Sequence, residues 1–405
     1  MRIGIVGAGI GGLCAAIGLQ RAGAQVTVFE QAPVLRAGGS GLSVFANGLR
    51  ALDVIGVGDA FRQATSAEVR ELRGGQRRPD GAWLARIPTE AVAELRVIDR
   101  AVLHDLLLGH LAPGTVRSGC RIVRADPDGS VVVDPGREPE ADGAPAPGQD
   151  AEAGPSGTSD ESFDLVVSAD GLRSTVRRSW PGDPGIRYAG YSAWRGITDR
   201  PVDLHGEAGE TWGIRQRFGL APLSDGRVYW FAVATMAQDV RIEDEMAAVR
   251  ATFGHWHAPI PALLEATPAD RVHRLPINEL AGPLPSYVRG RTVLLGDAAH
   301  AMTPNLGQGG GQAMEDAAVL TEALGGLARD DAPNPVQVGS ALARYDALRR
   351  PRSQRIARMS RLVGQMGHVR GAAVSRVRDQ VLRLTPERAL VRQIRQVQGW
   401  EPPAG

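Results

Sequence analysis

The sequence predicts an α/β fold in which a parallel sheet is interleaved with an antiparallel sheet and followed by a helical C-terminus. Three observations support this. A glycine-rich β-α-β pattern begins at residue 3, short alternating runs fill residues 185–275, and an arginine-rich helical stretch closes the chain. The chain has 405 residues, of which 43% are hydrophobic and 22% charged, which fits two globular domains.

Composition excludes several classes of function. The net charge is only +1, so no nucleic-acid partner and no stable membrane association are expected. Cys14 and Cys120 are the only cysteines, too few for a disulfide framework or a zinc site, and no metal is expected. Residues 3–19 are apolar but shorter than the roughly 20 residues of a spanning helix. We therefore expect a soluble, cytoplasmic protein that is a monomer or a dimer.

The first element is a buried strand at residues 3–6, followed by a helix to about residue 22 and a second strand at residues 25–29. Between the first strand and the helix lies a GxGxxG motif, formed by Gly7, Ala8, Gly9, Ile10, Gly11 and Gly12. Such glycines permit a tight turn, close approach of a pyrophosphate and close helix–strand packing. Glu30 ends the second strand, where a carboxylate can accept hydrogen bonds from a ribose. This pattern predicts a Rossmann-like dinucleotide site, but alone it does not separate NAD from FAD.

A second motif runs from Asp170 to Arg177, directly after the strand at residues 163–169. A strand that ends in Asp-Gly and continues into a helix places polar groups at the carboxyl edge of the sheet, where such sheets bind ligands. The same pattern also fits a simple capped helix start. Both interpretations stay open from the sequence.

The third motif is the most informative. A buried strand at residues 292–295 ends in Gly296-Asp297, and a glycine-rich turn at residues 304–311 then opens a long helix. The Asp297 carboxylate can accept a hydrogen bond from a sugar or ribityl hydroxyl. Backbone N–H groups of the turn can face a flat, electron-accepting ring and stabilise its negative charge on reduction.

Together these motifs resemble the class A flavoprotein monooxygenases, which share the para-hydroxybenzoate hydroxylase fold. The resemblance covers residues 1–360, and within the family the segment 304–316 looks closest to the urate hydroxylase, 3-hydroxybenzoate 6-hydroxylase and zeaxanthin epoxidase branch. It implies that the FAD-binding residues are Gly7, Gly9, Ile10, Gly11, Gly12, Glu30, Gly41, Leu42, Arg100, Asp170, Asp297, Leu306, Gly307 and Gly309. Gly41 and Leu42 belong to a segment, residues 38–43, that resembles the family's second flavin-contacting loop.

The resemblance implies a reaction as well. An FAD-dependent monooxygenase would use NADH or NADPH and O2 to hydroxylate or epoxidise a small aromatic or alkene substrate through a flavin C4a-hydroperoxide. Three alternatives remain: a flavin reductase of the same fold, an NAD-dependent dehydrogenase, and a non-catalytic FAD-containing binding protein.

Four residues are candidates for catalysis. Arg195 lies in a segment that resembles the strand crossing the flavin and could hold an anionic substrate, or form a structural ion pair. Arg215 stands where this branch often has glycine, and would narrow the pocket or add charge. His300 could be a general base, or bond only to backbone, and Pro304 could shape the flavin loop. Arg217 and Tyr229 are further candidates, although such residues commonly line half-buried sheets.

These assignments divide the chain. We expect a discontinuous FAD-binding domain at residues 1–184 and 276–345, an antiparallel substrate domain at residues 185–275, and a C-terminal helical segment at residues 346–405. A flexible surface loop is expected at residues 135–162, which are rich in Pro, Gly and acidic residues. From residue 344 to 395 the chain has 14 Arg and three acidic residues. That segment could dock on a membrane or an acidic partner, but a solvated helical cover over the FAD domain is favoured.

Overall fold

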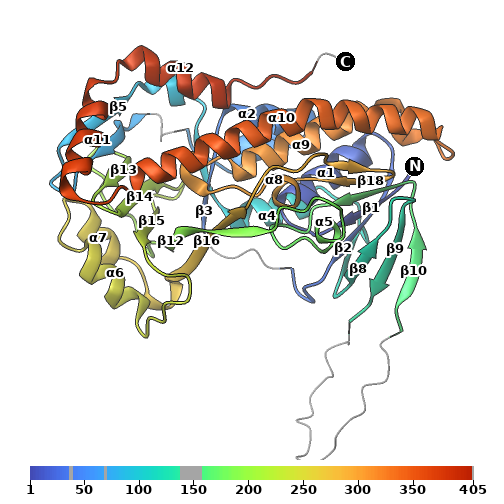
Figure 1. The fold of residues 1–405 in the computed structure, drawn as a ribbon, viewed down its shortest axis with the longest axis horizontal. Coiled ribbons are helices and arrows are strands. Elements are labelled where there is room, and N and C mark those ends of the chain that lie inside the picture. Colours follow the sequence, from blue (N-terminus) through green and yellow to red (C-terminus); the bar gives the residue numbers. More distant parts are fainter. Residues whose placement is uncertain (36–39, 68–70, 137–156, 404–405) are drawn as a thin grey trace, which may run out of the picture.

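The computed structural model describes residues 1–35, 40–67, 71–136 and 157–403. It has two large sheets, and the long helix α10 extends from one toward the other (Figure 1). The first sheet has six strands in the order β17-β18-β11-β1-β2-β7, parallel except for β17. Its strands are β1 (Arg2–Val6), β2 (Gln25–Glu30), β7 (Val116–Ser118), β11 (Leu165–Ser168), β17 (Val288–Arg289) and β18 (Thr292–Leu294).

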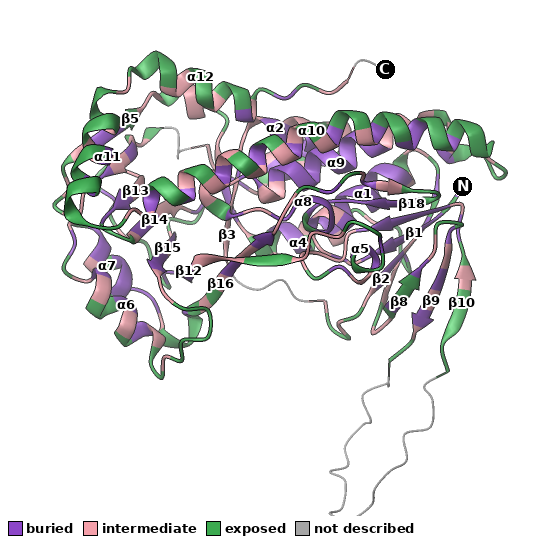
Figure 2. Cartoon of the chain, in the orientation of Figure 1, coloured by how far each residue is buried: buried purple, intermediate pink, exposed green. Residues whose placement is uncertain are grey.

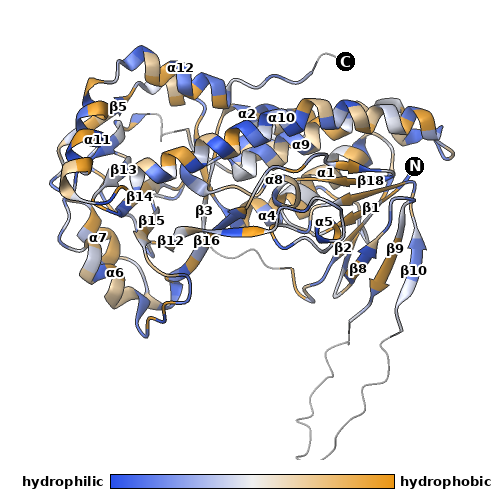
Figure 3. Cartoon of the chain, viewed as in Figure 1, coloured by the Kyte–Doolittle hydropathy of each residue, from blue (hydrophilic) through white to orange (hydrophobic). Residues whose placement is uncertain are grey.

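The central strands of this sheet are apolar on both faces, as expected for parallel strands covered on both sides. All of β11 and β18 is buried, and the labelled strands β1 and β18 are coloured as buried and hydrophobic in Figures 2 and 3. Helix α1 (Ile10–Arg21) packs on α9 (Gly309–Leu324), and α10 (Pro335–Gly367) also packs on α9. The glycine motif and the third motif are thereby brought to one edge of the sheet.

The second sheet has seven strands in the order β16-β12-β15-β14-β13-β4-β5, antiparallel except for the β13–β4 pair. They are β4 (Gly74–Arg77), β5 (Trp83–Ile87), β12 (Ile186–Ile197), β13 (Gly209–Trp212), β14 (Gln216–Pro222), β15 (Val228–Thr235) and β16 (His273–Leu280). Strands β4 and β5 come from inside the range expected for the FAD-binding domain, and β16 continues past residue 275. The sheet is therefore built from more of the chain than the expected substrate domain.

The remaining strands form two smaller sheets. One has β3 (Gly41–Val44) and β6 (Arg96–Asp99), and the other has β8 (Arg121–Ala125), β9 (Ser130–Asp134) and β10 (Ser159–Ser162). Because β10 pairs antiparallel with β9, the last four residues of the expected loop 135–162 form a strand. Residues 137–156 of that loop lie outside the described residues.

The predicted helical C-terminus is confirmed. After α10 come α11 (Ala372–Leu384) and α12 (Glu387–Gln398), and α12 contacts both α2 and β5. The other helices are α2 (Ala46–Val54), α3 (Gly58–Gln63), η2 (Thr89–Val92), α4 (Arg100–Leu108), α5 (Thr175–Arg178), α6 (Glu245–Phe253), α7 (Ile260–Glu265), η3 (Ala269–Arg271), α8 (Asp297–His300), η4 (Pro304–Leu306) and η5 (Gly325–Arg329). In the described part of the chain, no helix is both long enough and apolar enough to cross a membrane.

Candidate active site

A cavity of about 440 Å³ lies between the two sheets, and residues of all three sequence motifs line it. From the expected FAD-binding set, the lining residues are Gly9, Ile10, Gly11, Gly41, Leu42, Arg100, Asp297, Gly307 and Gly309. The expected catalytic residues Arg195 and Pro304 line it too. The motifs are far apart in sequence, so the fold itself brings them together.

The first motif has the geometry of a phosphate-binding turn. Gly7 has φ +99°, a left-handed conformation that favours glycine, and a Cβ at Gly12 would overlap the Gly7 carbonyl. A Cβ at Gly9 would meet nothing within 4 Å, because Gly9 faces open space at the cavity. No side chain caps the N-terminus of α1. Its first N–H groups are therefore available to an anion.

Glu30 and a histidine hold this turn in place. The Glu30 carboxylate accepts hydrogen bonds from the backbone N–H groups of Ala8 and Ala32, both at 2.9 Å. His104, which the sequence did not point to, donates from Nε2 to the Ala8 carbonyl at 2.8 Å. Glu30 does not line the cavity, so its contact with a ribose stays a prediction.

Residues 41–43 of the second flavin-contacting loop lie in β3, whose pairing with β6 sets Gly41 opposite Asp99. This pairing places Arg100 at the cavity, where its backbone N–H donates to the Ser40 carbonyl at 2.9 Å. The Arg100 guanidinium is exposed and has no hydrogen-bond partner among the described residues. Gly38 and Gly39 lie outside those residues.

The third motif presents a free carboxylate and a second open helix end. Asp297 starts α8, is exposed at the cavity, and makes no ion pair or side-chain hydrogen bond within the described chain. Gly307 has φ +62°, and the next helix, α9, begins at Gly309 without a side-chain cap. Leu306 lies in η4 just behind this turn and does not line the cavity.

The second sheet supplies the opposite wall. Its apolar members, listed by strand, are Ala193 from β12, Phe231 and Val233 from β15, and Leu275 and Ile277 from β16. Arg195 and Tyr229 add polar groups, and neither side chain has a hydrogen-bond partner among the described residues. Burial raises the pKa of Tyr229, while the nearby Arg195 charge acts to lower it. The phenol is therefore neutral at ordinary pH.

A second polar group on this wall is fully connected. Arg217 is 2% exposed and donates to Glu210 from Nε at 3.0 Å and to Asn305 Oδ1 at 2.5 Å. Asn305 in turn donates from Nδ2 to the Tyr191 hydroxyl at 2.8 Å. His368 stacks on Tyr191 with ring centroids 4.1 Å apart. The sequence marked Arg217 only as a weak candidate, and its link to Asn305 requires the tertiary fold.

The cavity fits FAD in its donor set. The uncapped N-terminus of α1 and Arg100 suit the diphosphate, Asp297 suits the ribityl hydroxyls, and the uncapped N-terminus of α9 suits the flavin ring. Open space at Gly9, Gly171 and Gly309 leaves the backbone accessible to a ligand.

Comparison with known proteins agrees with this geometry. Residues 140–360 match a family model described as FAD binding domain, and residues 5–55 match one described as NAD(P)-binding Rossmann-like domain. Aurachin C monooxygenase/isomerase of Stigmatella aurantiaca is 36% identical over 391 residues, which cover 94% of this chain and 93% of that protein. The chain belongs to the FAD-dependent monooxygenases.

Two further relatives agree with this assignment. The 6-hydroxynicotinate 3-monooxygenase of Bordetella bronchiseptica is 32% identical, with 89% and 90% coverage. A Klebsiella pneumoniae protein solved with FAD and uric acid has a TM-score of 0.82, 26% identity and coverage of 100% and 98%. The class A resemblance, the fold class and the use of FAD, NAD(P)H and O2 are confirmed. These relatives support neither the reductase, nor the dehydrogenase, nor the binding-protein alternative.

Two expected catalytic roles in this monooxygenase need correction. His300 is 3% exposed, donates from Nε2 to Asp316 at 2.6 Å, and lines a separate cavity of about 100 Å³. It therefore does not reach the active-site cavity as a general base. Arg215 is exposed in the turn between β13 and β14 with φ +60°, and does not line the cavity either. The left-handed backbone of this turn favours glycine, so the turn itself accounts for the glycine that the resemblance led us to expect at this position.

In the second motif of the monooxygenase, the aspartate holds the local backbone and side chains together. Asp170 accepts hydrogen bonds from Ser168 Oγ at 2.6 Å and from the Thr175 backbone N–H at 2.8 Å. The neighbouring Gly171 and Leu172 line the cavity instead. Arg177, fully buried, donates to the Leu172 carbonyl at 2.8 Å and to the Ala298 carbonyl at 3.2 Å. It thereby ties the second motif to the third.

A buried ionic cluster between α9 and α10 holds the third motif in place through Asp316. Arg349 on α10 pairs with Glu315 and, at 2.7 Å, with Asp316, and all three side chains are fully buried. Asp316 also accepts from the Gly296 backbone N–H at 2.8 Å. Burial alone would raise the pKa of Asp316, but the His300 and Arg349 charges outweigh it and lower the pKa. Arg349 could not be recognised from the sequence, because it stands among many surface arginines.

Proposed function

We propose that this monooxygenase hydroxylates a small aromatic ring that carries an anionic oxygen or an ionisable hydroxyl group. The observation that carries the proposal is the pair Arg195 and Tyr229. Both line the cavity beside the glycines of the flavin loop, and neither has a hydrogen-bond partner among the described residues. A half-buried cation and a neutral phenol suit an oxygen anion, which accepts hydrogen bonds from both.

The relatives support a ring of this kind. One is named for 6-hydroxynicotinate, and the Klebsiella structure contains uric acid. Both compounds are nitrogen heteroaromatic rings that bear oxygen. An alkene would offer no oxygen to Arg195, and no feature of the cavity favours epoxidation over hydroxylation.

The balanced reaction consumes the ring, O2, NAD(P)H and one proton, and gives the hydroxylated ring, water and NAD(P)+. When bound, FAD would supply the redox chemistry that links NAD(P)H and O2 to the ring. The chain's own residues orient and desolvate the ring. Arg195 stabilises its oxygen anion, Tyr229 donates a hydrogen bond to it, and Phe231 and Val233 exclude water.

We propose that the groups of the cavity that were expected to bind FAD each contact one part of the cofactor. The α1 N-terminus at Gly9 and Arg100 would hold the diphosphate, and Asp297 the ribityl chain. The α9 N-terminus, from Gly307 onward, would face the flavin ring. We also propose that the first sheet and α9 form the FAD-binding domain, with the second sheet as substrate domain. We propose that the enzyme acts in the cytoplasm. Its free thiols, Cys14 and Cys120, are compatible with that reducing environment.

The test is Arg195→Gln, with Arg200→Gln as the matched control, because Arg200 is exposed and, within the described chain, pairs only with its neighbour Asp199. Steady-state kinetics with a panel of hydroxypyridines, hydroxyquinolines and phenolic acids comes first. For an anionic ring, Arg195→Gln should raise KM roughly ten- to hundredfold, the effect of losing one charged hydrogen bond. FAD content should not change, and Arg200→Gln should behave as wild type. An unchanged KM in Arg195→Gln would remove the basis for an anionic substrate.

A further inference from the structure

Helix α11 has its polar face against the protein and its apolar face toward solvent. Ser375 and Arg378 are buried, and Arg378 donates to the Gly213 carbonyl at 3.0 Å while lying over the Trp212 ring. On another face, four aliphatic side chains are 53%, 64%, 53% and 69% exposed: Val374, Val377, Val381 and Leu384.

The spacing of these four residues, three, four and three, places them on one side of the helix. Surface helices normally turn such a stripe toward the core, so α11 is reversed. Figures 2 and 3 show the same helix as largely exposed and partly hydrophobic. A continuous apolar stripe in water is unfavourable and indicates a surface that is covered in use.

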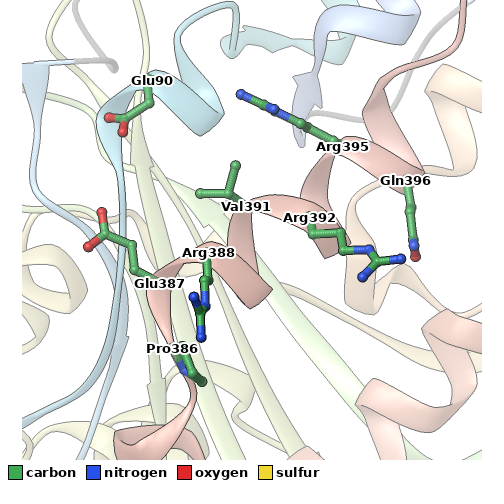
Figure 4. Close-up of a pocket in the computed structure, with 8 residues that line it drawn as sticks. All are labelled: Glu90, Pro386, Glu387, Arg388, Val391, Arg392, Arg395 and Gln396. Carbon is green, nitrogen blue, oxygen red and sulfur yellow. The ribbon is translucent and has the colours of Figure 1, made fainter.

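Several arginines on α11 and α12 have no acidic partner among the described residues. Arg376 and Arg383 on α11 are exposed, and no acidic side chain among the described residues pairs with them. The following helix α12 adds three more exposed arginines, which line an open groove of about 860 Å³ (Figure 4). They are Arg388, Arg392 and Arg395, and the groove's acidic members, Glu90 and Glu387, do not pair with them in the described chain.

A second copy of the chain suits this surface poorly. Four aliphatic side chains fall far short of the roughly 20–30 residues that each partner contributes to a stable interface. Two copies would also bring two sets of unpaired arginines together. An anionic lipid surface complements both features, because aliphatic side chains enter the headgroup boundary while arginines meet lipid phosphates.

We propose that α11, with the arginines of α12, docks the enzyme reversibly on an anionic membrane surface. The helix lies in the interface, and no described helix needs to cross the bilayer. Helix α11 follows α10 directly, and Gly367 at the end of α10 packs against Arg217 of the cavity wall. The docking surface is thus one short connection away from the active site. The docking itself does not depend on the proposed substrate.

The test is sedimentation of the full-length FAD-loaded enzyme with vesicles of phosphatidylcholine, with and without phosphatidylglycerol. Wild type should sediment with the anionic vesicles, and added salt should release it. Val377→Asp combined with Val381→Asp should reduce the partition coefficient roughly tenfold or more, since two aliphatic side chains no longer insert. Val336→Asp, at a 75% exposed valine on α10, is the matched control and should bind as wild type.

Flavin absorbance and NAD(P)H oxidation in the absence of vesicles should match wild type in each variant, which shows that the fold is intact. If the aspartate pair fails to fold, Val377→Ser with Val381→Ser replaces it. Equal sedimentation with both vesicle types overturns the proposal, as does undiminished binding by the Val377/Val381 variant. A wild-type dimer by light scattering that dissociates in this variant, without vesicle binding, would assign the surface to a second copy instead.

Discussion

Alanine at Gly364 should both destabilise the enzyme and weaken substrate binding. Gly364 is buried in α10, where a Cβ would overlap Asn305 Nδ2 and come within 2.7 Å of the Tyr191 hydroxyl. Asn305 and Tyr191 share a hydrogen bond of 2.8 Å and both line the cavity. Because the helix backbone cannot retreat easily, the added methyl group must push this pair toward the cavity or break its bond.

The expected size follows from three contributions. Overpacking a buried site costs about 1–3 kcal/mol, and loss of the Asn305–Tyr191 hydrogen bond about 1 kcal/mol. The better helix propensity of alanine offsets about 0.8–1.0 kcal/mol. The net loss in the free energy of unfolding should be about 1–3 kcal/mol. Gly339→Ala, on the same helix, has open space around its Cβ and should instead stabilise by up to about 1 kcal/mol.

The two substitutions should therefore change the free energy of unfolding in opposite directions. Denaturant unfolding of the FAD-loaded enzyme measures the stability, and steady-state kinetics measures KM for the substrate. Gly364→Ala should raise KM, while Gly339→Ala should leave it unchanged. If the two variants were equally stable and had equal KM, the packing of α10 against the cavity wall would be refuted.

Three further predictions concern charged groups. Arg349→Met removes the buried cation that Glu315 and Asp316 share, and leaves Glu315 paired with Arg352 and Asp316 with His300. It should destabilise by about 3 kcal/mol, measured by denaturant unfolding; a loss below about 1 kcal/mol would contradict it. Burial, together with the Arg217 charge, lowers the pKa of His368 from 6.5 to about 3. Below pH 6.5 the unfolded chain takes up a proton that the folded chain excludes, so this contribution to stability falls as pH falls toward 3. His368→Asn should flatten that part of the stability profile, and a profile identical to wild type would contradict this account. Asp297→Ala should lower FAD affinity, measured by flavin fluorescence, whereas retention of wild-type affinity would exclude Asp297 as a ligand.

Much of the cavity could be predicted from sequence, because its parts are local motifs. A strand, glycines and a helix in sequence order suffice to place Gly9 at a ligand edge, and the same logic places Gly307 and Asp297. Each of these positions depends on a turn whose geometry is encoded within a few residues. The predicted order of parallel sheet, second sheet and helices follows from the same local patterns.

The remaining features depend on contacts between distant segments. Strands β4 and β5 join the second sheet although they precede it by about a hundred residues, a pairing that periodicity does not reveal. His300 turns away from the cavity because α9 places Asp316 beside it. Nothing in its sequence neighbourhood distinguishes Arg349, in the core, from the exposed Arg376. The reversed orientation of α11 is likewise a property of what it packs against.

The most direct test of the central claim is oxygen incorporation by the purified enzyme. The protein should be yellow with bound FAD, and its NAD(P)H oxidation should rise with one hydroxylated ring of the substrate panel. Under isotopically labelled O2, mass spectrometry should then find one labelled oxygen atom in the product, and the other should appear in water. A product without label, or NAD(P)H oxidation that no ring compound accelerates, would contradict the account.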